Sequence, residues 1–151
     1  MELVISDASC IIALEDIGEL RILKGLFSQI VVTDIVRNEI QAELPDWIKV
    51  SKDYEERELK ILELELDTGE ASAIALALKN PGNRIILDER KGRSVAKRLG
   101  LKVIGTLGLI VKAKQKGIIS SGKEVLNKLE DHGFWLSSQM KQGLLDKLGE
   151  K

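Results

Sequence analysis

The sequence of 151 residues contains few of the residue types on which several common kinds of site depend. Its single cysteine, Cys10, excludes an internal disulfide and suits a reducing cytoplasm, where we expect the protein to reside. One cysteine and one histidine cannot form a zinc site of the cysteine/histidine kind. Aromatic residues make up only 3% of the chain, so aliphatic side chains must build the core. No apolar run approaches the roughly 20 residues that a membrane-spanning helix requires, so we expect no membrane contact.

Charged residues are abundant, and the two signs are unevenly placed along the chain. They make up 31% of the sequence, with a formal net charge of −1. Residues 39–70 include 11 acidic and 4 basic residues, whereas residues 84–116 include 10 basic and 2 acidic residues. A basic segment of this kind can bind a polyanion even in a neutral protein, although solvated helix faces also carry lysine and arginine. Any metal bound here would be a hard cation held by carboxylates.

Short aliphatic runs alternate with segments of helical periodicity over most of the chain. The strands that we predict are residues 3–5, 30–32, 47–50, 84–87 and 102–104. The helices that we predict are residues 11–14, 17–27 with a break at Gly18, 34–44, 53–66, 71–78, 90–99, 106–116, 123–130 and 137–148. This alternation predicts an α/β fold, in which a three-layer α/β/α arrangement encloses a parallel sheet of about five strands.

The length fits a single domain that covers residues 1–151. We find no internal repeat, low-complexity tract or linker that would divide it. Residues 120–151 contain helical segments only, so we predict that they form a C-terminal helical extension packed on the domain. This extension would serve either as a packing arm or as a dimer element.

Four acidic residues lie at the ends of predicted strands or on predicted helices that begin near the same edge of the sheet. Asp7 directly follows the first strand and Asp88 follows the fourth. Glu70 lies in the first turn of the most apolar helix, and Glu39 borders an apolar face of the helix after the second strand. Taken singly, each acid is typical of a helix cap or a surface charge. Because ligands of open α/β sheets bind outside the carboxyl ends of the strands, the four together favour a shared site.

The order of these acids and the motifs around them resemble the PIN domain. The motifs are GEASAIALA at residues 69–77, DERKGRSVAKRLGL at residues 88–101 and GTLG at residues 105–108. Each motif is weak alone, but their order and spacing are specific, and the similarity runs nearly from end to end. It is most marked to a prokaryotic, VapC-related branch of PIN-like proteins.

The resemblance implies a metal-dependent ribonuclease that cleaves RNA phosphodiester bonds through metal-activated water. It implies one or two Mg²⁺ or Mn²⁺ ions, with four carboxylates acting as both the metal ligands and the catalytic residues: Asp7, Glu39, Glu70 and Asp88. Ser9 would support the site by orienting a water or a phosphate, and Glu89 by partnering or replacing Asp88. The chain departs from many PIN nucleases in having Leu87-Asp88-Glu89 where a Thr-x-Asp pattern is common.

The predicted helix after Asp88 supplies the side that would contact RNA. Its basic residues would bind phosphates and make binding sensitive to salt: Arg90, Lys91, Arg93 and Lys97. No aromatic residue is interleaved with them, so we expect them to contact the RNA backbone and to read little sequence. The resemblance also implies a homodimer and, for a toxin-like nuclease, an antitoxin-like protein partner.

The main alternative is a non-catalytic PIN-like module that binds nucleic acid or a partner protein and retains the acids as relics. Two other α/β classes fit the sequence poorly. A phospho-receiver domain requires an acid after the third strand and a lysine after the fifth, where this chain has Ser51 and Gly105-Thr106. A dinucleotide-binding fold requires a G-x-G-x-x-G motif after the first strand, and the chain lacks one there.

Overall fold

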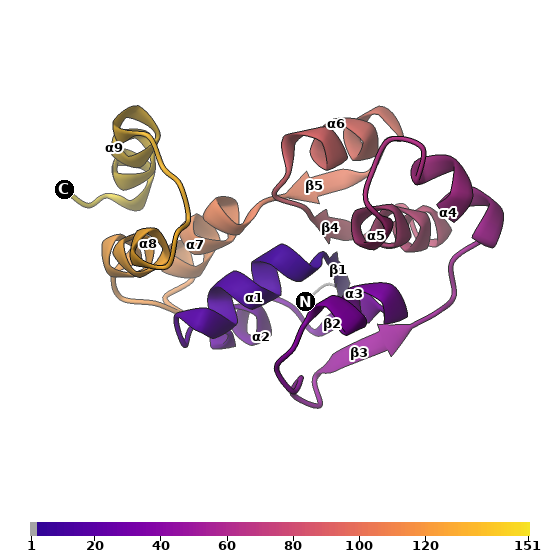
Figure 1. Cartoon of the computed structure of the whole chain (residues 1–151). Coiled ribbons are helices and arrows are strands. Elements are labelled where there is room, and N and C mark those ends of the chain that lie inside the picture. Colours follow the sequence, from indigo (N-terminus) through magenta and orange to yellow (C-terminus); the bar gives the residue numbers. More distant parts are fainter. Residues whose placement is uncertain (1–2) are drawn as a thin grey trace.

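Five strands form a single parallel sheet in the computed structural model, which describes residues 3–151 (Figure 1). The strands are β1 (Leu3–Ser6), β2 (Gln29–Thr33), β3 (Ile48–Ser51), β4 (Arg84–Ile86) and β5 (Lys102–Ile104). Their order across the sheet is β3-β2-β1-β4-β5, and every neighbouring pair is parallel. Ile5 in the central strand lies opposite Val31 of β2 and Ile85 of β4. The predicted α/β fold with a parallel sheet of about five strands is therefore confirmed.

Successive side chains along the strands pack into two separate hydrophobic cores. Val4 and Ile86 pack into one core, whereas their neighbours Ile5 and Ile85 pack into the other. This follows from strand geometry, because successive side chains point to opposite faces of a sheet. A sheet that is buried on both faces must be apolar in both sets of positions, which explains why the strands read as continuous aliphatic runs.

One face of the sheet is covered by α1 (Ala8–Asp16), α2 (Arg21–Leu26) and α7 (Thr106–Gln115). The last two helices, α8 (Gly122–Asp131) and α9 (Ser138–Leu148), continue this core through packing on α7. The opposite face is covered by α4 (Glu56–Leu62), α5 (Thr68–Lys79) and α6 (Arg90–Arg98). Figure 1 shows α8 and α9 at one end of the molecule and α4 at the other. No helix within residues 3–151 has the length and apolar character needed to cross a bilayer.

Helix α3 (Asp34–Glu39) is shorter than the predicted helix that runs to Pro45. Its start is as expected, since Thr33 Oγ1 accepts a hydrogen bond from the Val36 backbone N–H at 3.0 Å. The helix ends at Ile40, which takes an extended conformation and is buried in the core. Arg37 Nη1 donates to the Ile40 carbonyl oxygen at 2.9 Å. The packing of Ile40 and this satisfied carbonyl end the helix before proline does.

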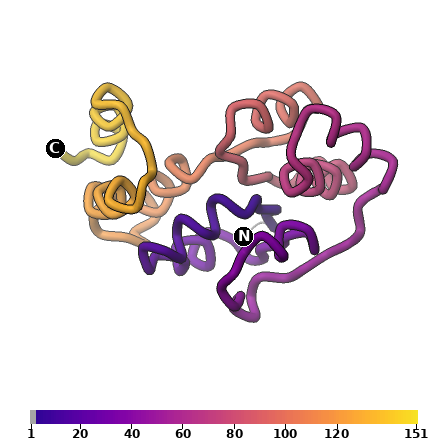
Figure 2. Tube along the Cα trace, viewed as in Figure 1, coloured from indigo at the N-terminus to yellow at the C-terminus, as the bar shows by residue number. Residues whose placement is uncertain are grey.

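The chain leaves the neighbouring strands β1 and β4 toward opposite faces of the sheet. After β1 it enters α1 on one face of the sheet, and after β4 it enters α6 on the other face (Figure 2). Such a reversal between adjacent parallel strands opens a crevice at their carboxyl ends, where open α/β sheets bind ligands. Asp7 and Asp88 follow these two strand ends, so the fold brings together residues that lie far apart in the sequence.

Candidate active site

Asp7 and Asp88 form the part of the site at the ends of β1 and β4. Asp7 caps helix α1, because its Oδ1 accepts from the Cys10 backbone N–H at 3.0 Å. Its Oδ2 accepts from the backbone N–H of Asp88 at 3.3 Å. Only 4% of Asp7 is exposed. Burial, followed by the charge of Asp88, raises the pKa of Asp7 to about 7. Ionised Asp7 is thus costly here, and a nearby cation would offset that cost.

Thr106 at the start of α7 holds the Asp88 carboxylate. The Thr106 backbone N–H donates to Asp88 Oδ1 at 2.8 Å, and the Thr106 hydroxyl donates to Oδ2 at 2.5 Å. Each carboxylate oxygen keeps a further lone pair for a cation. A Cβ at Gly105 would lie 3.1 Å from Asp88 Oδ1 and 2.7 Å from Arg93 Nη1. The side chains of Asp88 and Arg93 can therefore come close to the backbone here because residue 105 has no side chain.

A second group of acids lies at the start of α5 and α6. One carboxylate oxygen from each of Asp67, Glu70 and Glu89 lies within 4.8 Å of the others. Glu70 is 8% exposed. Burial, followed by the charges of Asp67 and Glu89, raises the pKa of Glu70 to about 8. Three crowded carboxylates repel one another, and oxygen ligands of this kind fit a hard divalent cation such as Mg²⁺ or Mn²⁺.

Glu39 reaches this second group from helix α3. Its carboxylate lies against the Cα of Gly69 and would overlap a Cβ there. Burial and then the charge of Asp67 raise the pKa of Glu39. Helices α3 and α5 are also joined through Thr33 and Ser72, whose hydroxyl oxygens lie 2.7 Å apart. Glu39 therefore extends the acidic site on the side of Asp67.

The structure thus arranges the predicted acids as two neighbouring groups. It brings Asp7 and Asp88 together, and it brings Glu70 together with Glu89. The charge of Asp67 raises the pKa of Asp7 as well as that of Glu70, so Asp67 electrostatically couples the two groups.

Ser9 lies in the first turn of α1, two residues after Asp7. It lines a pocket with Asp16, His132 and Phe134, and its predicted role in orienting a water or a phosphate stays a prediction.

Sequence reasoning missed two residues of this site, Asp67 and Thr106. Asp67 caps helix α5, accepting from the Glu70 backbone N–H at 2.9 Å. A capping residue followed three positions later by glutamate marks a helix start, so Asp67 and Glu70 formed a detectable pair. Thr106 comes two residues after the short strand β5, at the same edge of the sheet as Asp88. The sequence shows that Thr106 follows a predicted strand, but it does not show that Thr106 donates hydrogen bonds to Asp88.

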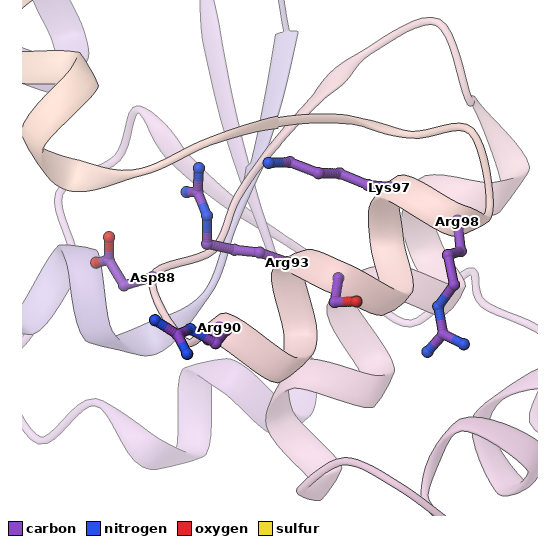
Figure 3. A pocket seen from close by; sticks show the side chains of 6 residues that line it. Asp88, Arg90, Arg93, Lys97 and Arg98 are labelled. Atoms are coloured by element: carbon purple, nitrogen blue, oxygen red, sulfur yellow. The ribbon is translucent and has the colours of Figure 1, made fainter.

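A basic pocket of about 550 Å³ adjoins Asp88 along helix α6 (Figure 3). Its lining consists of Asp88, Arg90, Arg93, Ser94, Lys97 and Arg98. Arg93 is held in place because its Nη1 donates to the Leu87 carbonyl oxygen at 2.8 Å. Lys91 is exposed on α6 but does not line the pocket. Three of the four predicted phosphate-binding residues therefore surround one hollow beside the acids.

Replacing Gly92 with alanine is expected to disturb the acidic group around Glu70 far more than the fold. A Cβ at Gly92 would lie 2.7 Å from Glu70 Oε2, the end of a flexible side chain that can turn away. Within helix α6, alanine is intrinsically favoured over glycine by roughly 1 kcal/mol, so the melting temperature should change little. We expect Mn²⁺ affinity, measured by isothermal titration calorimetry, to fall by about tenfold. Unchanged Mn²⁺ affinity would show that Glu70 is not a ligand; Gly82→Ala, which meets no neighbour, is the control.

Comparison with protein families gives a match that spans nearly the whole chain. A family model described as a PIN domain matches residues 3–150. Comparison with the curated proteins gives no match. The matched range includes both groups of acids, the basic helix and the C-terminal helices.

Proposed function

The chain belongs to the PIN domain family, whose members are generally nucleases that use divalent metals, and from this premise we propose that it is a metal-dependent ribonuclease. The observation that carries the proposal is the meeting of two acidic groups with a basic helix at the carboxyl ends of β1 and β4. We propose Mg²⁺ or Mn²⁺ as the metal, because carboxylate oxygens suit hard cations. RNA is the proposed substrate, with its phosphates along α6.

The residues of the site divide the work of phosphodiester hydrolysis. Asp7 and Asp88 would hold one cation, and Asp67, Glu70 and Glu89 would hold a second, with Glu39 beside them. A bound divalent cation lowers the pKa of water and stabilises charge on phosphate oxygens. Thr106 fixes the orientation of Asp88, which limits the positions that a cation at Asp88 can take. The basic residues of α6 would bind the phosphates that flank the scissile one.

A cleavage assay tests this function. A short end-labelled single-stranded RNA is incubated with the purified protein in Mg²⁺, Mn²⁺, Ca²⁺ or EDTA, with DNA of the same sequence in parallel. We expect cleavage of RNA with Mg²⁺ or Mn²⁺ and none with EDTA. Cleavage of DNA but not of RNA would contradict RNA as the substrate. Cleavage that persists in EDTA would contradict the proposed dependence on a metal.

One observation favours a second candidate, a non-catalytic module that binds RNA or a partner protein. Both oxygens of Asp88 already accept hydrogen bonds from Thr106, a satisfied arrangement that also occurs in purely structural sites. If RNA binds but no divalent cation supports its cleavage, this second candidate replaces the first.

Neutralising the basic pocket is expected to weaken RNA binding and reduce its dependence on salt. Lys97→Gln and Arg90→Gln each remove one cation from the pocket. For single strands, each lost phosphate contact should lower the slope of log affinity against log salt concentration by roughly 0.7. Fluorescence anisotropy over a range of KCl concentrations measures this slope. Lys24→Gln, at an exposed position of α2, is the matched control and should leave the slope unchanged; equal slopes for all variants would contradict a role for α6.

A further inference from the structure

A second pocket adjoins the basic one at Asp88. It has a volume of about 490 Å³. Asp88 and Arg93 line both pockets, so the two hollows adjoin at these residues. The far wall of the second pocket comes from the connection between α8 and α9 and the first turn of α9, which contribute Phe134, Trp135 and Met140. The C-terminal helices therefore contribute directly to the surroundings of the candidate active site.

This wall holds aromatic surface that the fold does not bury. The chain has only five aromatic residues, and two of them are adjacent here. Trp135 is 75% exposed and Met140 is 44% exposed. Tryptophan is enriched at binding interfaces, and here it lies beside a second exposed apolar side chain at the rim of a pocket.

The segment that carries Trp135 is anchored on both sides. The Phe134 backbone N–H donates to the Leu129 carbonyl oxygen at 2.9 Å, and Leu136 is buried in the core. The Ser137 hydroxyl then accepts from the Met140 backbone N–H at 3.0 Å and caps α9. Trp135 thus projects from a short segment whose neighbours are held, which limits the entropy that a ligand must remove.

We propose that this second pocket binds an unpaired nucleobase of single-stranded RNA, which stacks on Trp135 next to the scissile phosphate. The position of the base next to the scissile phosphate rests on the proposed nuclease function. The binding of a base in this pocket does not. Charge favours this occupant, because the pocket continues into the basic surface of α6 through Arg93. An RNA backbone that follows α6 past Asp88 arrives at the aromatic wall. Basic grooves paired with stacking aromatics are the common means of binding single strands.

The basic helix itself carries no aromatic residue, so its sequence predicts contact with the RNA backbone only. The stacking surface comes instead from a segment roughly forty residues further along the chain. Because stacking tolerates any base but requires an unpaired one, the pocket selects single-stranded over double-stranded RNA.

The test measures stacking without catalysis. Short single-stranded RNAs that carry 2-aminopurine at successive positions are titrated with the protein in EDTA, and quenching of the fluorescence reports stacking. We expect Trp135→Ala to abolish the quenching at one position and to weaken binding by about tenfold, while Trp135→Phe retains most of both. An RNA with an abasic site at that position should bind wild type and Trp135→Ala equally. Leu64→Ala, which removes another exposed apolar side chain (84% exposed), is the matched control and should bind like wild type.

Three results would overturn the proposal. Binding and quenching that Trp135→Ala leaves unchanged would show that no base uses the pocket. An equal loss of affinity for the intact and the abasic RNA would show that Trp135 acts through the fold. A wild-type dimer in sedimentation that Trp135→Ala converts to monomer would assign this surface to a second copy of the chain. If stacking holds but no cleavage occurs with any metal, the nuclease function fails and the base pocket stands.

Discussion

Asp7→Asn is expected to lower metal-dependent RNA cleavage by on the order of 100-fold or more while leaving the fold intact. Asparagine keeps the shape of the side chain, and its carbonyl oxygen can still accept from the Cys10 backbone N–H that Asp7 Oδ1 now caps. The variant loses the negative charge and one acceptor oxygen. In the wild-type protein that oxygen accepts from the Asp88 backbone N–H. A buried carboxylate that serves as a ligand cannot be replaced by a neutral amide without loss of metal affinity.

The measurement compares initial cleavage rates over a range of Mn²⁺ concentrations. Asp131→Asn, on the exposed end of α8, is the matched control and should cleave like wild type. If the loss in Asp7→Asn is recovered at high Mn²⁺, the effect lies in metal affinity; if not, it lies in the chemical step. Wild-type activity in Asp7→Asn would refute the assignment of Asp7, and a nuclease would then have to use other groups.

The second large effect is a loss of stability with rising pH when no divalent cation is present. The ordinary pKa values of Asp7 and Glu70 are 3.8 and 4.5, whereas the folded protein raises them to about 7 and about 8. Below the ordinary pKa values both carboxyls are protonated in the folded and the unfolded chain, and their ionisation costs the folded state nothing. Between the ordinary and the raised values the unfolded chain ionises first, so stability falls continuously until the folded groups ionise too.

The size of this loss follows from about 1.4 kcal/mol for each pKa unit. Allowing for the mutual influence of the acids, we expect the free energy of unfolding to fall by roughly 3 kcal/mol between pH 5.5 and pH 8.5. That corresponds to a decrease of about 10 °C in melting temperature for a domain of this size. Mg²⁺ or Mn²⁺ should restore most of the loss at pH 8.5, because a ligand that binds the folded state alone stabilises it.

Glu70→Gln separates this effect from the general titration of surface acids. The variant has no carboxyl to ionise at position 70, so in EDTA it should be more stable than wild type at pH 8.5 and gain less from Mn²⁺. Glu43→Gln, an exposed acid elsewhere, should follow wild type at every pH. Urea denaturation at both pH values, with and without Mn²⁺, checks this. Stability that rises through the window in EDTA would contradict the expected burial of Asp7 and Glu70.

The strands and the acids at their ends were accessible from sequence, because local composition determines both. The β-branched run at residues 30–32 lies within β2, and the aliphatic run before Asp88 contains β4. Asp7 and Asp88 were identified because each directly follows such a run. The end of α3 was predicted wrongly, since it depends on the packing of Ile40 and not on the proline signal further along.

Asp67 could also have been found, since it caps α5 three residues before Glu70, but the other missed features depend on contacts between distant segments. The bond between Thr106 and Asp88 joins residues separated by 18 positions and requires β4 and β5 to be neighbours. The second pocket requires Trp135 to return to Asp88 from the C-terminal helices. Which acids would share a metal also depends on side-chain direction, which the spacing of Glu39, Glu70 and Asp88 does not specify.

Three glycines of the sequence motifs each border a carboxylate: Gly69 borders Glu39, Gly92 borders Glu70 and Gly105 borders Asp88. None of the three has a positive φ angle, so none is required for a left-handed backbone. Their role is steric, since polar side-chain atoms, including a carboxyl oxygen in each case, occupy or crowd the space of the missing methyl group. The positions of these glycines in the sequence therefore mark the places where the acidic side chains come close to the backbone. A related chain that keeps every acid but has alanine at one of these positions would retain the composition of the centre and lose its shape.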